Sequence, residues 1–263
     1  MKSTRSARPG RVAVVILAAV LMPSITVAAG TTPDQVRKIL ASPVGAPTRS
    51  LAGRDLADID LSRMDLRGAD LSHANLFGTK LVSADLRGAN LTGANLNGAW
   101  IMGADFTGAN LTNASMLSVV VIGGEVTARP KFVRANLTGV RLIAELDGAD
   151  FSQANLTRAR FGVDIKNQGM GQMRTNLSGA KLAGAILIGA DLNRSLLTFA
   201  DLHGADLRNA NMFRVDLSGA DLTGANVAGA DFNEAVIDGA HLSGVLGVQS
   251  AKGLTASESR KQP

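Results

Sequence analysis

The sequence predicts an all-β solenoid whose coils have four short sides. From Leu56 onward a large hydrophobic residue, mostly Leu, recurs every five residues, and a small residue, mostly Ala, stands two positions before it. A period of five differs from the period of about 3.6 of an α-helix and from the two-residue period of a strand. The chain therefore turns a corner once per repeat, with one large and one small side chain pointing inward from each side.

The residues between the inward positions suit the outside of such a coil. Asp70 separates the inward residues Ala69 and Leu71, and Gly68 follows Leu66 by two positions, a spacing repeated along the chain. Glycine suits a corner because some tight turns need a positive φ, which glycine adopts at little cost. Four such sides close one coil. We expect successive coils to stack through backbone hydrogen bonds at a spacing of about 4.8 Å.

Tandem Ala-(Asp/Asn)-Leu-X-X units, as at residues 69–71 and 220–222, resemble the pentapeptide-repeat family. The resemblance covers most of the chain, from Leu56 to beyond Leu242. It implies a right-handed quadrilateral β-helix, here of about eight to nine 20-residue coils. Members of that family often dimerise through the C-terminal coil, so the resemblance also implies a homodimer formed in this way.

Residues 1–29 predict a secretory signal peptide. A basic stretch, residues 1–11, precedes an apolar run over residues 12–22, and small residues allow cleavage near Ala29. The run of about 11 residues is shorter than the ~20 that span a bilayer. Cleavage gives a periplasmic or secreted protein without stable membrane insertion, and an uncleaved membrane anchor is the alternative.

Most of the net charge of the chain lies in this leader. A formal net charge of +5 is typical of nucleic-acid binding, but residues 1–29 hold four basic residues and no acidic one. The remainder holds 23 basic and 22 acidic residues, a net charge of +1, so we expect no nucleic-acid partner. The chain has no cysteine, so packing and hydrogen bonds stabilise the fold without disulfides.

Residues 30–50 are expected to form a linker and a short capping helix over residues 33–41. Thr32 suits the N-cap, Pro33 the first helical position and Gln35 the third. The apolar residues of this segment share one helical face: Val36, Ile39 and Leu40. Such a helix would cover the first coil, whose end otherwise exposes unpaired backbone and apolar core.

The β-helix is predicted over residues 51–246. The five-residue spacing breaks in two places, which predicts irregular loops near 123–135 and 162–176. Residues 247–263 are mostly polar and are expected to form a C-terminal tail.

The sequence offers no catalytic, metal or cofactor site, and we expect neither enzymatic activity nor a cofactor. The histidines stand at outward positions far apart in the sequence: His73, His203 and His241. Asp65, Asp85 and Asp105 occupy the same position in successive coils and predict a column on one face. Their carboxylates are expected to cap turn amides and to be balanced by Arg67 and Arg87, which leaves no free carboxylate pair for catalysis.

One set of outward residues departs from the polar exterior. Stacking the repeats coil upon coil brings five apolar side chains together: Val82, Trp100, Met102, Val120 and Ile122. A contiguous exposed apolar patch usually marks an interface, and Trp is a frequent binding anchor. The alternative is that the loop near 123–135 folds back over the patch and covers it with Phe132 and Val133.

These observations favour a non-enzymatic interaction or scaffold module that is exported and presents a rigid rod to a protein partner. A secreted effector acting on a host is a variant with another destination. The loops also resemble a branch of the family that mimics DNA and binds topoisomerases, including quinolone-resistance proteins. DNA mimicry requires a strongly negative surface, so the near-neutral mature charge and the export signal disfavour that alternative.

Overall fold

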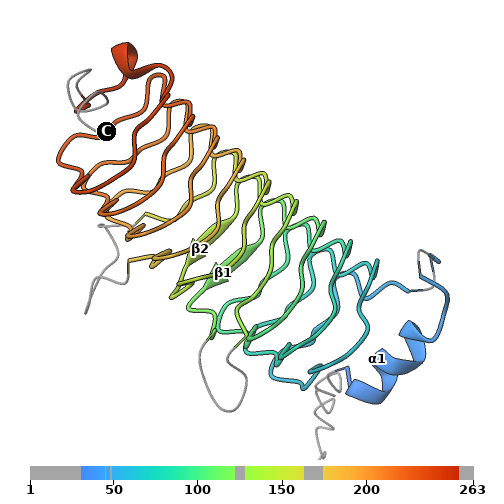
Figure 1. Ribbon diagram of the computed structural model, residues 1–263. Coiled ribbons are helices and arrows are strands. Elements are labelled where there is room, and N and C mark those ends of the chain that lie inside the picture. The colour runs from blue at the N-terminus through green and yellow to red at the C-terminus, as the bar shows by residue number, and fades with distance from the viewer. Residues whose placement is uncertain (1–30, 45, 48, 122–127, 163–173, 255–263) are drawn as a thin grey trace, which may run out of the picture.

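The protein is a straight rod of stacked coils with a short helix at its N-terminal end (Figure 1). The computed structural model describes residues 31–44, 46–47, 49–121, 128–162 and 174–254. The predicted signal peptide, residues 1–29, lies outside this part of the chain. No helix within the described ranges is long and apolar enough to cross a membrane.

Parallel backbone bridges join residues of successive coils, as the five-residue period predicts. Asp65 pairs with Asp85, and Asp85 pairs with Asp105. Most contacts are single bridges because the chain turns on both sides of each paired residue. Within the described residues, one pair of longer strands forms a parallel sheet, β1 (Ser115–Leu117) and β2 (Arg141–Ile143).

Four columns of paired residues define four faces of the rod, which we name by their contents. The tryptophan face carries Asp60, Lys80, Trp100 and Val120. The aspartate face carries Asp65, Asp85, Asp105, Lys131 and Asp150. The asparagine face carries Asp70, Asn90, Asn110, Asn136 and Asn155. The arginine face carries Asn95, Ser115, Arg141, Arg160 and Asp191.

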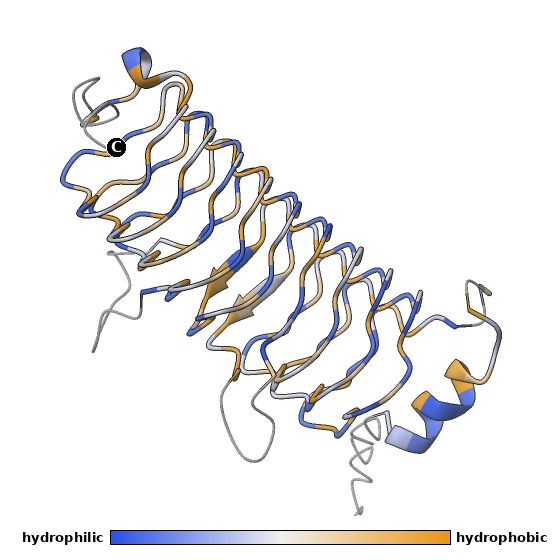
Figure 2. Ribbon diagram, viewed as in Figure 1, coloured by the Kyte–Doolittle hydropathy of each residue, from blue (hydrophilic) through white to orange (hydrophobic). Residues whose placement is uncertain are grey.

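The core is a column of Leu, Phe and Ala side chains inside the coils. The large and the small inward residues predicted from the repeat are buried, as Leu71 and Ala69 illustrate. Hydrophobic and hydrophilic residues alternate along the coils in Figure 2. The outward groups are therefore the ones available for binding.

The core also holds a residue that was expected in a loop. Phe132 is fully buried between Phe106 and Phe151, with ring centroids 4.9 and 4.7 Å apart. Lys131 already pairs with the aspartate face, so the coil resumes there and the predicted loop boundary of 123–135 is wrong at its end. The repeat phase explains this, because Phe132 and Ala135 occupy inward positions.

The predicted loop 162–176 and the predicted tail 247–263 also have bounds in the structure that differ from the predicted ones. Thr175 is buried within the predicted loop 162–176, and its single hydroxyl lies within hydrogen-bonding distance of two carbonyl oxygens, that of Phe161 at 2.8 Å and that of Leu142 at 3.0 Å. In the predicted tail 247–263, Lys252 pairs with Asp231 in the preceding coil. The short 3₁₀-helix η2 (Val248–Ser250) precedes that bridge. Backbone pairing therefore extends the last coil beyond residue 246.

The N-terminal helix α1 (Pro33–Leu40) lies at the end of the rod. Thr32 and Gln35 form the predicted capping box, in which each side chain accepts a hydrogen bond from the backbone N–H of the other residue. Val36 is fully buried. Ile39 and Leu40 are partly buried and pack against the core of the rod.

Candidate functional site

The apolar patch predicted from the sequence lies on the tryptophan face. Trp100 is 40% exposed and pairs through its backbone with Lys80 on one side and Val120 on the other. Val82 and Val120 are half-buried. The structure therefore brings these apolar side chains together near the N-terminal half of the rod. Ile122 lies outside the described residues.

Met102 does not contribute exposed surface, and this part of the prediction is wrong. Its side chain is only 3% exposed. The reason is the path of the next coil, since the carbonyl oxygen of Ala128 accepts a hydrogen bond from the N–H of Gly103 at 2.8 Å. The chain thus returns alongside Met102. The exposed patch consists of the Trp100 ring with parts of Val82 and Val120.

The indole ring of Trp100 contacts a cation and presents its ring N–H. The Nζ of Lys80 lies 5.8 Å from the ring centroid, which is a cation–π contact. The backbone N–H of Trp100 donates to the carbonyl oxygen of Thr79 at 3.0 Å. Within the described residues the indole N–H has no hydrogen-bond acceptor. A half-exposed indole with a free donor suits a binding anchor.

A groove beside this patch was not predicted from the sequence. It has a volume of about 680 Å³ and lies between α1 and the tryptophan face. Its lining residues are Pro33, Asp34, Arg37, Asp60, Ser62, Arg63 and Val82. Val82 belongs to both the groove and the patch, so the two form one continuous surface. The sequence indicated a helix before the first coil but gave no information on where that helix docks.

The groove has charged walls. Asp60 accepts a hydrogen bond from the backbone N–H of Ser62 at 2.9 Å. The pKa of Asp60 is lowered, first by hydrogen bonding to Ser62 and then by the charges of Lys80 and Arg37. Arg37 also pairs with Asp34 at 2.5 Å. Arg63 forms no ion pair with any described residue, so it remains available to a ligand carboxylate.

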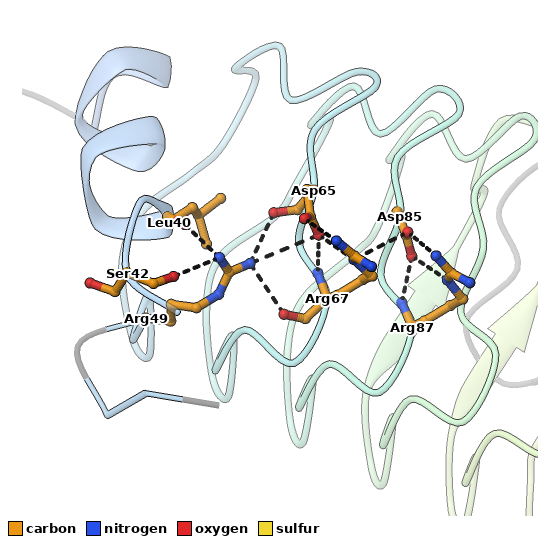
Figure 3. Close-up of polar contacts among 7 residues, drawn as sticks. All are labelled: Leu40, Ser42, Arg49, Asp65, Arg67, Asp85 and Arg87. Carbon is orange, nitrogen blue, oxygen red and sulfur yellow. Dashed lines mark hydrogen bonds and ion pairs between the residues drawn. The ribbon is translucent and has the colours of Figure 1, made fainter. Parts of the chain in front are cut away.

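The aspartate face forms the predicted column, and two of its carboxylates, Asp65 and Asp85, form ion pairs with arginines of the same face (Figure 3). Asp65 accepts from the backbone N–H of Arg67 at 3.1 Å and pairs with the guanidinium at 2.7 Å. Asp85 and Arg87 repeat this arrangement one coil further, at 2.6 Å. The hydrogen bond from Arg67 lowers the pKa of Asp65 to about 2. These groups cap turns and balance each other.

Of the three predicted histidines, one stands apart and two lie near the same aspartate. The three histidines lie in different places: His73 at a corner with φ 56°, and His203 and His241 on the aspartate face around Asp221. Together with hydrogen bonding to Thr223, the two histidines lower the pKa of Asp221. Across the described ranges, no three acidic or histidine side chains are grouped so that they could hold a metal ion.

Comparison with known proteins places these coils in a family. A sequence model described as pentapeptide repeats matches in eight copies. The matched residues are 50–81, 69–108, 79–117, 131–162, 175–212 and 210–246. No curated protein sequence matches the chain.

Several solved structures are similar. One is HetL, a pentapeptide repeat protein involved in heterocyst differentiation regulation from the cyanobacterium Nostoc sp. strain PCC 7120. HetL is 29% identical to this chain, and the match covers 84% of this chain and 96% of HetL, with a TM-score of 0.37. A pentapeptide repeat protein from the Arabidopsis thaliana thylakoid lumen is 30% identical over 42% of this chain and 68% of its own, with a TM-score of 0.25. Full-length QnrB1, a plasmid-mediated fluoroquinolone resistance protein, is 17% identical over 73% and 90% of the two chains, with a TM-score of 0.39.

The family match covers more than half of the 263 residues. It falls on the segments whose inward Leu and Ala residues form the core of the rod. The fold of this family is the right-handed β-helix that the sequence resemblance implied. The chain belongs to the pentapeptide-repeat family.

Proposed function

We propose that this protein is an exported, non-enzymatic interaction module that binds a protein partner on its tryptophan face. The observation that carries the proposal is the Trp100 ring, 40% exposed, next to Lys80 and beside the groove under α1. Backbone hydrogen bonds join each coil to the next, so the face is rigid before a partner arrives. Preorganisation of this kind reduces the ordering entropy lost on binding.

The rod that presents this face has, in our proposal, about eight to nine 20-residue coils, with α1 as its N-terminal cap. The buried Val36 supports the capping role. So does the guanidinium of Arg49, which donates to the carbonyl oxygens of Leu40 and Asp65 and thus ties the helix to the first coil (Figure 3).

Export is part of the same proposal. Residues 1–29 would direct secretion, and cleavage near Ala29 would release a periplasmic or extracellular protein with no stable membrane insertion. The support is the order of features in that segment, a basic stretch without acidic residues followed by an apolar run. Cell fractionation with an antibody against residues 247–263 tests it. Recovery of a chain of full length in the cytoplasm would contradict export.

The C-terminal coil is proposed to form a homodimer. Val236 and Leu246 occupy outward positions of the last coil and are 44% and 59% exposed, whereas the corresponding positions of the preceding coil carry the polar residues Asp216 and Asn226. Light scattering on the purified protein tests this. Leu246→Glu should convert a dimer to a monomer, and a monomeric wild-type protein would contradict the proposal.

Binding of a partner through the tryptophan face is tested by substitution. Trp100→Ser should abolish capture of the partner by the purified protein lacking residues 1–29, and the thermal midpoint should stay close to that of the wild type. Phe77→Ser is the matched control, because Phe77 is an aromatic residue on another face that is 50% exposed. If Trp100→Ser lowers the thermal midpoint and the variant still captures the partner, the ring has a packing role and the proposal is wrong.

A further inference from the structure

Arg141 and Arg160 lie directly opposite each other on the arginine face. They pair through their backbones, with the N–H of Leu142 donating to the carbonyl oxygen of Arg160 at 2.9 Å. Both side chains are exposed, and neither forms an ion pair or a side-chain hydrogen bond with another described residue. Like charges opposite each other on neighbouring strands are destabilising. The pair therefore needs an explanation other than stability.

Among the described residues, the column neighbours of this pair form no ion pair with it. Arg141 is followed in the column by Ser115 on one side, and Arg160 by Asp191 on the other. The Oδ1 of Asp191 accepts from the backbone N–H and the Nδ2 of Asn193 at 3.2 and 2.7 Å, and from the Nδ2 of Asn211 at 2.9 Å. The Oδ1 of this carboxylate is thus engaged by amide donors rather than by Arg160.

Apolar side chains lie beside the two arginines on the same face. β1 and β2 pair in register, so Leu117 lies opposite Ile143. Both side chains are half-buried, two residues along the chain from Ser115 and Arg141 respectively. Arg141 and Ile143 therefore share one coil, with Arg160 in the next coil and Leu117 in the preceding one. We name this surface, formed by Leu117, Arg141, Ile143 and Arg160, the arginine strip.

We propose that the arginine strip binds an acidic segment of a protein partner, with carboxylates on Arg141 and Arg160 and apolar side chains on Leu117 and Ile143. The proposal rests on the proposed function in that the module binds protein, but it uses another face. Guanidinium groups pair with carboxylates through two parallel hydrogen bonds, which fixes both position and orientation.

The composition of the strip favours a peptide over other polyanions. Single-stranded nucleic acid is held largely by stacking of bases on aromatic rings, and the strip contains none. A membrane surface is bound by apolar side chains that insert into the lipid, whereas Leu117 and Ile143 are half-buried against the rod. Carboxylates alternating with apolar side chains match the strip in both charge and hydrophobicity.

The test uses the purified protein lacking residues 1–29 and a fluorescent peptide of alternating Glu and Leu, with binding measured by anisotropy. The comparison ligands are the corresponding Gln and Leu peptide, a single-stranded oligonucleotide and phosphatidylglycerol vesicles. The double variant Arg141→Gln with Arg160→Gln should weaken the acidic peptide by at least about tenfold, because each charged hydrogen bond contributes more than a neutral one. The affinity should also fall with added salt.

The matched control is Arg54→Gln with Arg134→Gln, which removes the same charge from two other exposed arginines. This control should leave the affinity nearly unchanged. An equal loss in both double variants, or tighter binding of the oligonucleotide or the vesicles than of the acidic peptide, would overturn the proposal.

Two further readouts separate the outcomes. The thermal midpoint of the strip variant should be equal to or above that of the wild type, because the substitution removes a repulsion. A lower midpoint would give the two arginines a structural role and overturn the proposal. Trp100→Ser should not change peptide affinity, so a failure of the tryptophan face to bind a partner is distinguishable from a failure of the arginine strip.

Discussion

The guanidinium of Arg49 donates a hydrogen bond to the backbone carbonyl oxygen of Asp65, at 3.0 Å from its Nη2 (Figure 3). Arg49 stands one coil before Ala69, in the inward position that small residues occupy in later coils. A long side chain fits there because α1, and not another coil, lies on the N-terminal side of the first coil (Figure 1). The same guanidinium also donates to the carbonyl oxygens of Leu40, Ser42 and Arg67, although Arg49 is only 4% exposed.

Arg49→Met should therefore loosen the N-terminal end of the rod. We expect the free energy of unfolding to fall by about 2–4 kcal/mol, because several buried carbonyl groups lose a charged donor. Urea denaturation measures this change. Arg54→Met is the control, since Arg54 is exposed and should matter little. An unchanged midpoint in Arg49→Met would contradict the role assigned to Arg49.

The stacked phenylalanines make a second prediction. Phe132→Ala should lower the free energy of unfolding by about 3–5 kcal/mol, because it leaves a cavity between Phe106 and Phe151. Phe132→Leu should have a much smaller effect, since Leu fills most of the large inward positions. Phe77→Ala serves as the surface control and should stay within about 0.5 kcal/mol. Equal effects of the two alanine variants would show that Phe132 is not in the core.

Two buried hydroxyl groups in positions usually filled by Ala should behave oppositely. The Oγ of Ser195 is buried without a hydrogen-bond partner in the described structure, so Ser195→Ala should stabilise the protein by about 1 kcal/mol. The Oγ1 of Thr79 donates to the carbonyl oxygen of Leu56 at 2.6 Å. Thr79→Val should destabilise by about 1 kcal/mol. Denaturation midpoints that shift in the same direction would contradict this assignment.

The paired aspartates predict a loss of stability in acid. The hydrogen bond from Arg67 holds the pKa of Asp65 at about 2, below its value of 3.8 in an unfolded chain, and Arg87 lowers the pKa of Asp85. A lowered pKa gives stability that is present above the unfolded pKa and is lost as the pH falls through the folded one. The thermal midpoint should therefore drop between about pH 4 and pH 2. Asp65→Asn should flatten this drop, and an unaltered pH profile would argue against the pairing.

Intrinsic fluorescence gives a direct view of the tryptophan face, because Trp100 is the only Trp in the sequence. Acrylamide should quench its emission in the folded protein to an intermediate extent, in keeping with a ring that is 40% exposed. Lys80→Ala should increase quenching, because it removes the cation above the ring. Emission that resists quenching until the protein unfolds would mean that the ring is covered.

Much of the fold follows from the sequence because the repeat is regular. Local spacing explains three features: the burial of Leu71 and Ala69, the column that holds Asp65 and Asp85, and the capping box at Thr32. Phe132 was misplaced because the irregular segment before it hides the point at which the five-residue phase resumes.

The candidate site was only partly predictable for a related reason. The period brings Trp100 and Val120 together, since both belong to one column. The burial of Met102 depends on the chain returning at Ala128, and the groove depends on where α1 docks. The irregular segment before Ala128 hides where the coil resumes, and α1 lies outside the repeat, so neither contact can be derived from the repeat.

The large and the small inward side chains of each repeat point into a closed column and leave only the outer faces for binding. The chain contains no cysteine, so single cysteines placed at Leu202, His203 and Ala205 can be labelled individually with a thiol reagent. The structure predicts fast labelling at 203, which is exposed, and labelling at 202 and 205 only after unfolding, since both are buried. Equal labelling rates at the three positions in the native protein would contradict the account.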